Sequence, residues 1–171
     1  NVKHGALAFG TDPHQVESIT RSIRKITPKP LIIKLTPNVT DITSIAKAAE
    51  NGGADAVSCI NTLVGMVIDT KKKRPVFPGK TGGLSGPAIR PVGVAMTWKV
   101  AHSISIPVIG MGGIMNFDDA LQYFMAGASA IQVGTGMFVD PALPERIFTG
   151  LLEYCTNETI NTVHDIAHLS D

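Results

Sequence analysis

The chain has few cysteines, almost no net charge and no long apolar run. Two cysteines, Cys59 and Cys155, do not make a disulfide framework, so we expect a reducing compartment, the cytoplasm. A formal net charge of +1 produces no global field that would attract nucleic acid or an anionic membrane surface. No apolar stretch reaches the roughly 20 residues that span a bilayer. We therefore expect neither nucleic acid nor a membrane as a partner.

What the chain does contain is typical of a compact folded protein. Hydrophobic residues make up 44% of its 171 residues, enough for a substantial buried core. This length predicts one domain that covers residues 1–171. The chain opens on Asn1 and not on methionine, and we expect that a preceding segment is missing.

Short apolar runs alternate with helical patterns along the chain. Strands are predicted at 31–35, 56–60, 108–109 and 130–133, and helices at about 13–27, 42–51, 118–126 and 144–155. A further helix presents Val94, Ala95, Trp98 and Ala101 on one face, and a surface helix is expected within 160–169. A long loop is expected at about 61–86, with the basic run 71–74 as a solvated part of it.

Alternating strands and helices leave two α/β architectures open. Four strands can form a small doubly wound sheet, or they can form half of a (β/α)₈ TIM barrel, which needs about 250 residues. We favour four parallel strands that form the C-terminal half of a barrel, because the last two strands end in glycine and the chain opens abruptly. A half-barrel has two open strand edges that need partners.

The strongest functional signal is a pair of glycine groups after the last two strands. Gly110, Gly112 and Gly113 follow one strand, and Gly134, Thr135 and Gly136 follow the next. The carboxyl ends of parallel barrel strands face the ligand, and bare backbone N–H groups there bind phosphate. Each group alone is also compatible with an ordinary turn, but together they predict a phosphate site.

Polar residues end the first two strands at the corresponding level. Lys34 interrupts an apolar strand near its end, where it either extends to solvent or points at a bound anion. Asn61 and Thr62 follow the next strand, where they either read a polar ligand or form a turn.

The segment 79–87 is rich in glycine and contains Gly-Lys-Thr. A nucleotide P-loop would need another glycine five positions before Gly79, but that residue is Arg74. The segment is suited to lie against a flat ring or a phosphate, or it is a flexible lid without ligand contact.

The remaining cysteines and histidines carry little chemistry. Cys59 and Cys155 are expected to be inert core thiols. His164 and His168 have helical spacing but lack the glutamate of the zinc-protease motif, so we expect no metal site.

Six motifs occur in the order and at the intervals found in one enzyme family. The chain resembles the class 1 dihydroorotate dehydrogenases, nearest the NAD-linked class 1B catalytic subunit, over its length to about residue 150. The motifs are Asn1-Val2-Lys3-His4-Gly5, Lys34-Leu35-Thr36-Pro37, Ile60-Asn61-Thr62, Gly82-Gly83-Leu84-Ser85-Gly86-Pro87, Gly110-Met111-Gly112-Gly113 and Val133-Gly134-Thr135.

The resemblance implies an FMN-binding (β/α)₈ barrel that oxidises dihydroorotate to orotate in pyrimidine biosynthesis. It also implies a homodimer and an electron-transfer subunit with FAD and an iron-sulfur cluster, with either NAD or fumarate as the final acceptor. By motif, the substrate would contact Asn1, Asn61 and Thr62. The flavin would contact Lys34 near its N1–O2 edge, with Ile60 and Gly86 beside the rings and Gly112, Gly113, Gly134 and Thr135 at the phosphate.

One departure from the family is large. The catalytic base of these enzymes is a cysteine that would stand two residues before Asn1, and neither Cys59 nor Cys155 occupies that place. We therefore expect the isolated chain to be inactive. Two other interpretations stay open: a phosphate-binding barrel isomerase or aldolase without flavin, and a non-catalytic flavin-binding module.

Overall fold

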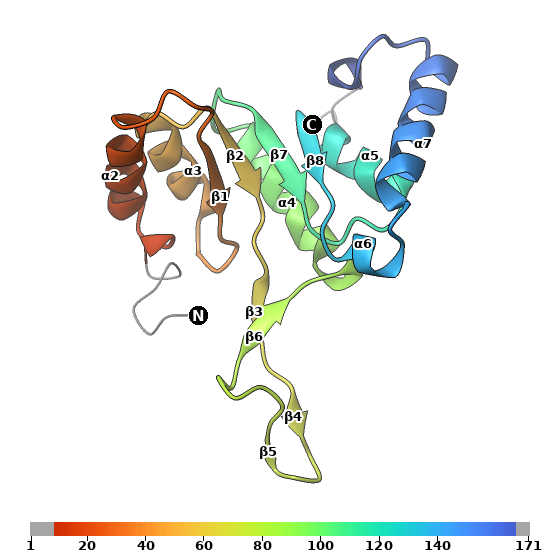
Figure 1. Cartoon of the computed structure of the whole chain (residues 1–171). Helices are drawn as coiled ribbons and strands as arrows, with labels where there is room; N and C mark the ends of the chain where they lie inside the picture. Colours follow the sequence, from red (N-terminus) through yellow and green to blue (C-terminus); the bar gives the residue numbers. More distant parts are fainter. Residues whose placement is uncertain (1–8, 167–171) are drawn as a thin grey trace.

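A sheet of four parallel strands forms the centre of the computed structural model, which describes residues 9–166 (Figure 1). The strands lie in the order β1-β2-β7-β8, and each neighbouring pair is parallel. Their bounds are Ile32–Leu35 for β1, Ala56–Cys59 for β2, Val108–Met111 for β7 and Ala130–Gln132 for β8. All four predicted strands are confirmed, with ends that differ by one or two residues.

Helices connect the strands, and three of them begin at a capping side chain. Asp12, Asp41 and Asn116 cap α2, α3 and α5 by accepting hydrogen bonds from backbone N–H groups of the first turn. Within residues 9–166 no helix is both long enough and apolar enough to cross a bilayer. The helices are α2 (Pro13–Arg24), α3 (Ile42–Asn51), α4 (Arg90–Ala101), α5 (Phe117–Met125), α6 (Gly136–Val139) and α7 (Leu143–Asn157), with a 3₁₀ turn η1 (Pro87–Ile89) before α4.

Strand order decides between the two architectures. The strands follow one another across the sheet in chain order, and each long helix contacts the next one, α2 with α3, α3 with α4, α4 with α5 and α5 with α7. A doubly wound sheet instead reverses its strand order and carries helices on both faces. The chain therefore forms half of a (β/α)₈ barrel, with its helices as one outer layer (Figure 1).

The two faces of the sheet have opposite character. Paired positions Leu35, Cys59, Gly110 and Ile131 face the helices and lie in or against the two apolar clusters of the core. Side chains alternate along a strand, so the adjacent row, which holds Lys34, faces the opposite side. The helices cover only the apolar row, which leaves the lysine on the open face.

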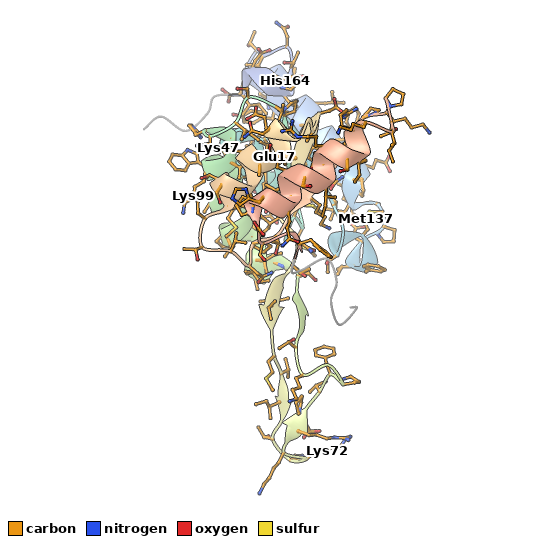
Figure 2. The ribbon with its side chains drawn as sticks, turned by 90° about the vertical axis from the view of Figure 1, so that its left-hand side faces the viewer. Glu17, Lys47, Lys72, Lys99, Met137 and His164 are labelled. Carbon is orange, nitrogen blue, oxygen red and sulfur yellow. The ribbon has the colours of Figure 1, made fainter. Side chains whose placement is uncertain are left out.

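The segment 61–86 is an arm that projects away from the sheet (Figures 1 and 2). It contains two short antiparallel strand pairs, β3 (Leu63–Gly65) with β6 (Gly82–Leu84) and β4 (Ile68–Asp69) with β5 (Arg74–Pro75). The segment is therefore not irregular throughout. The basic run 71–74 is exposed near the end of the arm, where Lys72 is labelled in Figure 2.

Two sequence-based expectations are wrong in detail. The buried residues of α4 are Gly93, Thr97 and Val100, whereas Ala95 is exposed. Small residues on that face allow α4 to approach α5 and the sheet closely, an effect that apolar periodicity does not detect. The described part of the tail, to residue 166, contains a 3₁₀ turn, η2 (Val163–Asp165), where a longer helix was expected. A capping box of Thr162 and Asp165 starts this turn, and the extended backbone of Ile166 ends it. His168 lies outside the described residues.

Candidate functional site

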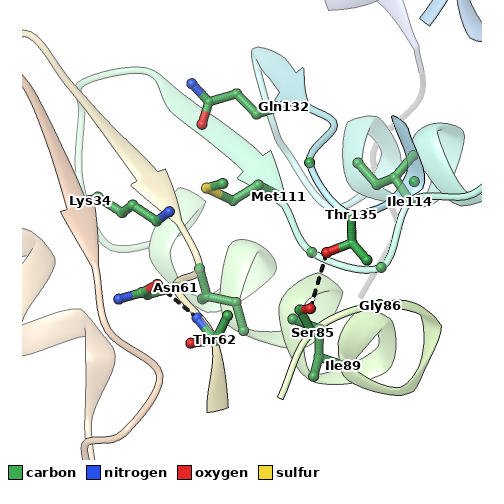
Figure 3. Close-up of a pocket in the computed structure, with 15 residues that line it drawn as sticks. Lys34, Asn61, Thr62, Ser85, Gly86, Ile89, Met111, Ile114, Gln132 and Thr135 are labelled. Atoms are coloured by element: carbon green, nitrogen blue, oxygen red, sulfur yellow. Dashed lines mark hydrogen bonds between the residues drawn. The ribbon is translucent and has the colours of Figure 1, made fainter. Parts of the chain in front are cut away.

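A cavity of about 160 Å³ lies at the carboxyl ends of the strands (Figure 3). Residues in or directly after each of the four strands line it, together with the segment that joins β6 to α4. The lining residues are Lys34, Ile60, Asn61, Thr62, Ser85, Gly86, Ile89, Met111, Gly112, Gly113, Ile114, Gln132, Gly134, Thr135 and Gly136. The strand ends therefore converge on one place, as barrel geometry requires.

Of the two glycine groups that predict a phosphate site, Gly136 lines the cavity but Gly110 does not, because its position in β7 faces the Tyr123 ring in the core. The structure brings together all but one of the residues that the family motifs assign to cofactor or substrate. These residues line the cavity: Lys34, Ile60, Asn61, Thr62, Gly86, Gly112, Gly113, Gly134 and Thr135. Asn1 lies outside the described residues. Which ligand each of these residues contacts stays a prediction.

Lys34 supplies the positive charge at the cavity. Its side chain leaves the open face of β1 and is exposed, and Figure 3 shows it extending from that strand over the cavity. Among the residues that the structure describes, none is a hydrogen-bond or ion-pair partner for its ammonium group. An unpaired ammonium beside a cavity can stabilise negative charge on a ligand.

Asn38 holds the backbone that carries Asn61 and Thr62. Its amide donates to the Thr62 carbonyl at 3.0 Å, and its side-chain oxygen accepts from the Val64 amide at 2.9 Å. The Asn61 side chain accepts from the Thr62 amide at 2.9 Å. Its own NH₂ group has no partner within residues 9–166, so it can still donate to a ligand.

A hydrogen bond joins the glycine-rich segment to the loop after β8. The Thr135 hydroxyl donates to the Ser85 hydroxyl at 3.0 Å, a link between residues fifty positions apart in the chain (Figure 3). Gly86 follows with φ of +83°, a conformation that favours glycine. The cavity is therefore closed on this side by a segment from outside the sheet.

The turn after β7 requires glycine for two reasons. Gly112 and Gly113 have φ of +125° and +70°. A Cβ atom on Gly113 would also lie 2.7 Å from the Gly86 carbonyl oxygen and 2.9 Å from the Arg90 amide nitrogen. The Gly113 amide N–H in this turn has no hydrogen-bond acceptor within residues 9–166.

Gly134 differs from these glycines because nothing in the described chain requires it. A Cβ atom there would meet no atom within 4 Å, and Gly134 is not among the described glycines with positive φ. The residue nevertheless lines the cavity. A ligand that binds close to the main chain needs such empty space beside the backbone.

An ion pair anchors the far end of the turn after β7. Arg90, the first residue of α4, pairs with the buried carboxylate of Asp119 in α5. The same carboxylate accepts a hydrogen bond from the Met115 amide at 2.9 Å, and Asn116 caps the Asp119 amide at 2.9 Å. The loop is thus tied to the starts of two helices.

Sequence reasoning did not assign five of the lining residues to the site. Gln132 ends an apolar strand with a polar side chain, the same signal that identified Lys34. Ser85 and Met111 stood inside motifs that were recognised, although no role was given to them. Ile89 and Ile114 carry no local signal. The five are Ser85, Ile89, Met111, Ile114 and Gln132.

Neither cysteine lines the cavity. Cys59 is fully buried in β2, and this burial raises the pKa of its thiol to about 12. It is an inert core thiol, as predicted. Cys155 in α7 is only half-buried, so the same expectation is wrong for its position: α7 lies at the outer surface and shields one side of it.

Comparisons with known proteins agree on one family. The family model described as dihydroorotate dehydrogenase matches residues 1–154. The chain is 51% identical over 166 residues to the catalytic subunit of dihydroorotate dehydrogenase B (NAD(+)) from Geobacter metallireducens, with 97% of this chain and 54% of the relative covered. The Parabacteroides distasonis protein of the same name is 48% identical over the same shares.

A solved structure shows the same fold. The crystal structure of DHODH in complex with ferulenol from Eimeria tenella matches with a TM-score of 0.73 and 25% identity. The match covers 92% of this chain and 48% of that one. The chain thus spans about half the length of the relatives it matches.

The two thiols should differ in reactivity in the folded protein. At pH 8 Cys59 stays protonated and buried, so it should not react with a thiol reagent, because the thiolate is the nucleophile. Cys155 is partly accessible and should react. Labelling followed by peptide mass spectrometry should find the label on Cys155 in native protein and on both residues after unfolding in guanidinium. Rapid labelling of native Cys59 would contradict the structure.

Proposed function

Because the chain belongs to the dihydroorotate dehydrogenase family, we propose that it forms the FMN-binding C-terminal half of a barrel that oxidises dihydroorotate to orotate. This places the protein in pyrimidine biosynthesis. The observation that carries the proposal is one cavity where Lys34 of β1, which has no partner within residues 9–166, lies with bare glycine backbone after β7 and β8.

The residues at the cavity fit FMN. Gly112, Gly113, Gly134 and Thr135 offer backbone N–H groups and a hydroxyl to its phosphate, and the open space at Gly134 admits the ligand. Ile60 and Gly86 line the same cavity and would flank the ring system. FMN, when bound, accepts the hydride that leaves the substrate.

Lys34 provides the charge that favours this reaction. Negative charge accumulates on the flavin ring when it is reduced, and the Lys34 ammonium has no other partner in the described chain. A fixed positive charge therefore stabilises the reduced form.

Asn61, Thr62 and Asn1 bind the pyrimidine through amide and hydroxyl groups. Oxidation also removes a carbon-bound proton, which needs a general base. Neither Cys59 nor Cys155 lines the cavity, so we assign the base to a cysteine in the part of the relatives that this chain does not span.

Residues 1–171 form one domain in this proposal, with 61–86 as an active-site arm. The relatives are named catalytic subunits, which supports an FAD and iron-sulfur partner that passes electrons to NAD. Two free cysteines support a cytoplasmic location.

The arm supports the further proposal of a homodimer. A two-stranded ribbon is marginally stable by itself in water, so an arm of such ribbons needs a surface to pack on. Its apolar side chains are exposed, which is typical of an interface. They are Val64, Met66, Val67, Ile68, Val76, Phe77 and Leu84.

Substitution of Gly134 tests the FMN site. In the full-length protein, Gly134→Ala should leave the free energy of unfolding of the apoprotein unchanged or raise it by up to about 1 kcal/mol, because the methyl group meets no atom of the described residues within 4 Å. The same methyl group should weaken FMN binding at least tenfold, as measured by quenching of flavin fluorescence.

Gly79→Ala is the matched control. It lies in the arm outside the cavity and also has room for a Cβ atom, so FMN affinity should not change. No yellow complex between the full-length wild-type protein and FMN would refute the proposed function, and a sugar phosphate bound in its place would favour the isomerase or aldolase interpretation.

Removal of the Lys34 charge should make the flavin harder to reduce. A hydrogen bond to a charged group is worth about 1.5–3 kcal/mol, so Lys34→Met should lower the two-electron reduction potential by roughly 30–60 mV. Anaerobic stopped-flow measurement should show flavin reduction by dihydroorotate slowed by about 10²-fold or more. The exposed Lys99→Met is the control, and equal potentials in both variants would contradict the role of Lys34.

A charge on the arm should dissociate the dimer. Val67 is 58% exposed, so Val67→Glu should leave the fold intact but place a charge in the interface, and should weaken dimerisation at least tenfold by sedimentation velocity. Lys72→Glu near the end of the arm is the control with the same new residue. An unchanged dimer together with loss of the electron-transfer subunit would assign the arm to that partner instead.

A further inference from the structure

Tyr123 connects the buried core with the glycine turn at the cavity. It lies in α5, and its side chain is fully buried. Its hydroxyl donates to the Gly112 carbonyl at 2.7 Å. Gly112 lines the cavity, whereas Tyr123 does not. A buried side chain thus holds one peptide group of the cavity wall from behind.

Small residues make a slot for this ring. A Cβ atom at Gly110 of β7 would overlap the Tyr123 ring, and one at Gly93 of α4 would overlap its hydroxyl. Gly110 and Gly93 thus allow β7 and α4 to close around the tyrosine. A ring that is packed on both sides cannot turn its hydroxyl away from Gly112 without loss of packing.

The hydrogen bond determines where the next amide points. The only cis peptide bond in the described chain joins Cys59 to Ile60, so the bond between Gly112 and Gly113 is trans. In a trans peptide the C=O and N–H groups point in opposite directions. With the Gly112 carbonyl held toward the core, the Gly113 N–H points away from Tyr123, and it has no acceptor in the described residues.

We propose that Tyr123 is a positioning residue for phosphate recognition: its hydroxyl fixes the Gly112–Gly113 peptide so that the Gly113 amide is presented to the phosphate of the bound flavin. This inference rests on the proposed function. Glycine turns are conformationally free, and an amide that is held in its binding orientation before the ligand arrives does not lose that freedom on binding.

The hydroxyl remains a donor under physiological conditions. Burial raises the pKa of Tyr123 above its ordinary value. Nearby Cys59 and Asp119 act in the same direction, and the charge of Arg90 opposes them. The hydrogen bond therefore does not vary with pH over the range in which the protein works.

Tyr123→Phe tests the inference because it removes only the hydroxyl. In the full-length apoprotein we expect the Kd for FMN to rise about tenfold, while the Kd for riboflavin, which has the same rings but no phosphate, stays within twofold. The ratio of the two Kd values separates phosphate recognition from a general loss of structure, which would weaken both ligands. Isothermal titration calorimetry measures both.

Tyr154→Phe is the matched control. Tyr154 is the only other tyrosine in the chain and lies in α7, away from the cavity, so both affinities should stay as in the wild type. If Tyr123→Phe preserves the wild-type ratio, the inference is overturned while the proposed function stands. If the wild-type protein does not bind FMN, both are overturned.

A crystal structure of the wild-type holoenzyme gives an answer even if the variant does not fold. We expect the Gly113 amide within hydrogen-bond distance of a phosphate oxygen and the Tyr123 hydroxyl still bound to the Gly112 carbonyl. A phosphate held without the Gly113 amide, or a Gly112 carbonyl turned away from Tyr123, would overturn the inference.

Discussion

The rest of the structure depends on the contact between the helices and the apolar row of the sheet, the side chains that face them. Burial of apolar surface is worth about 25 cal/mol per Å², and the row that includes Leu35 and Cys59 lies in or against the two core clusters. A shift of one residue in β1 would turn Lys34 into this core and Ile33 out of it. The same burial that stabilises the fold therefore keeps the lysine on the open face, beside the cavity.

Three polar side chains behind the cavity are paired with backbone groups of the loops that line it. Asn38 holds the segment after β2, the Asp119 carboxylate holds the loop after β7, and Tyr123 holds the glycine turn. Most buried polar groups in proteins are hydrogen-bonded, and in the described part of the chain the Arg90 Nε atom is the buried side-chain atom without a partner. Within residues 9–166 the Lys34 ammonium and the Gly113 amide at the cavity also have no partner, and they are left for a ligand.

The glycines at the site have two distinct physical origins. Gly113 needs both its positive φ and the absence of a side chain, because the Gly86 carbonyl and Arg90 press against it. Gly134 has neither requirement within the described chain. A glycine that the fold does not need, placed at a cavity, is a stronger indication of a ligand than one that a turn requires.

Local pattern was enough to predict the four strands and most of the helices, because periodicity and strand-end glycines are written in neighbouring positions. The family motifs, which are also local, selected nine described residues that line the cavity. Tertiary structure alone decided between a doubly wound sheet and half a barrel, paired the strands of the arm and buried Gly93 and Thr97 rather than Ala95. It alone joined Tyr123 to Gly112 and Ser85 to Thr135. These outcomes depend on which distant segments pack together, and that choice is made by shape and hydrogen bonding in three dimensions, which no window of sequence contains.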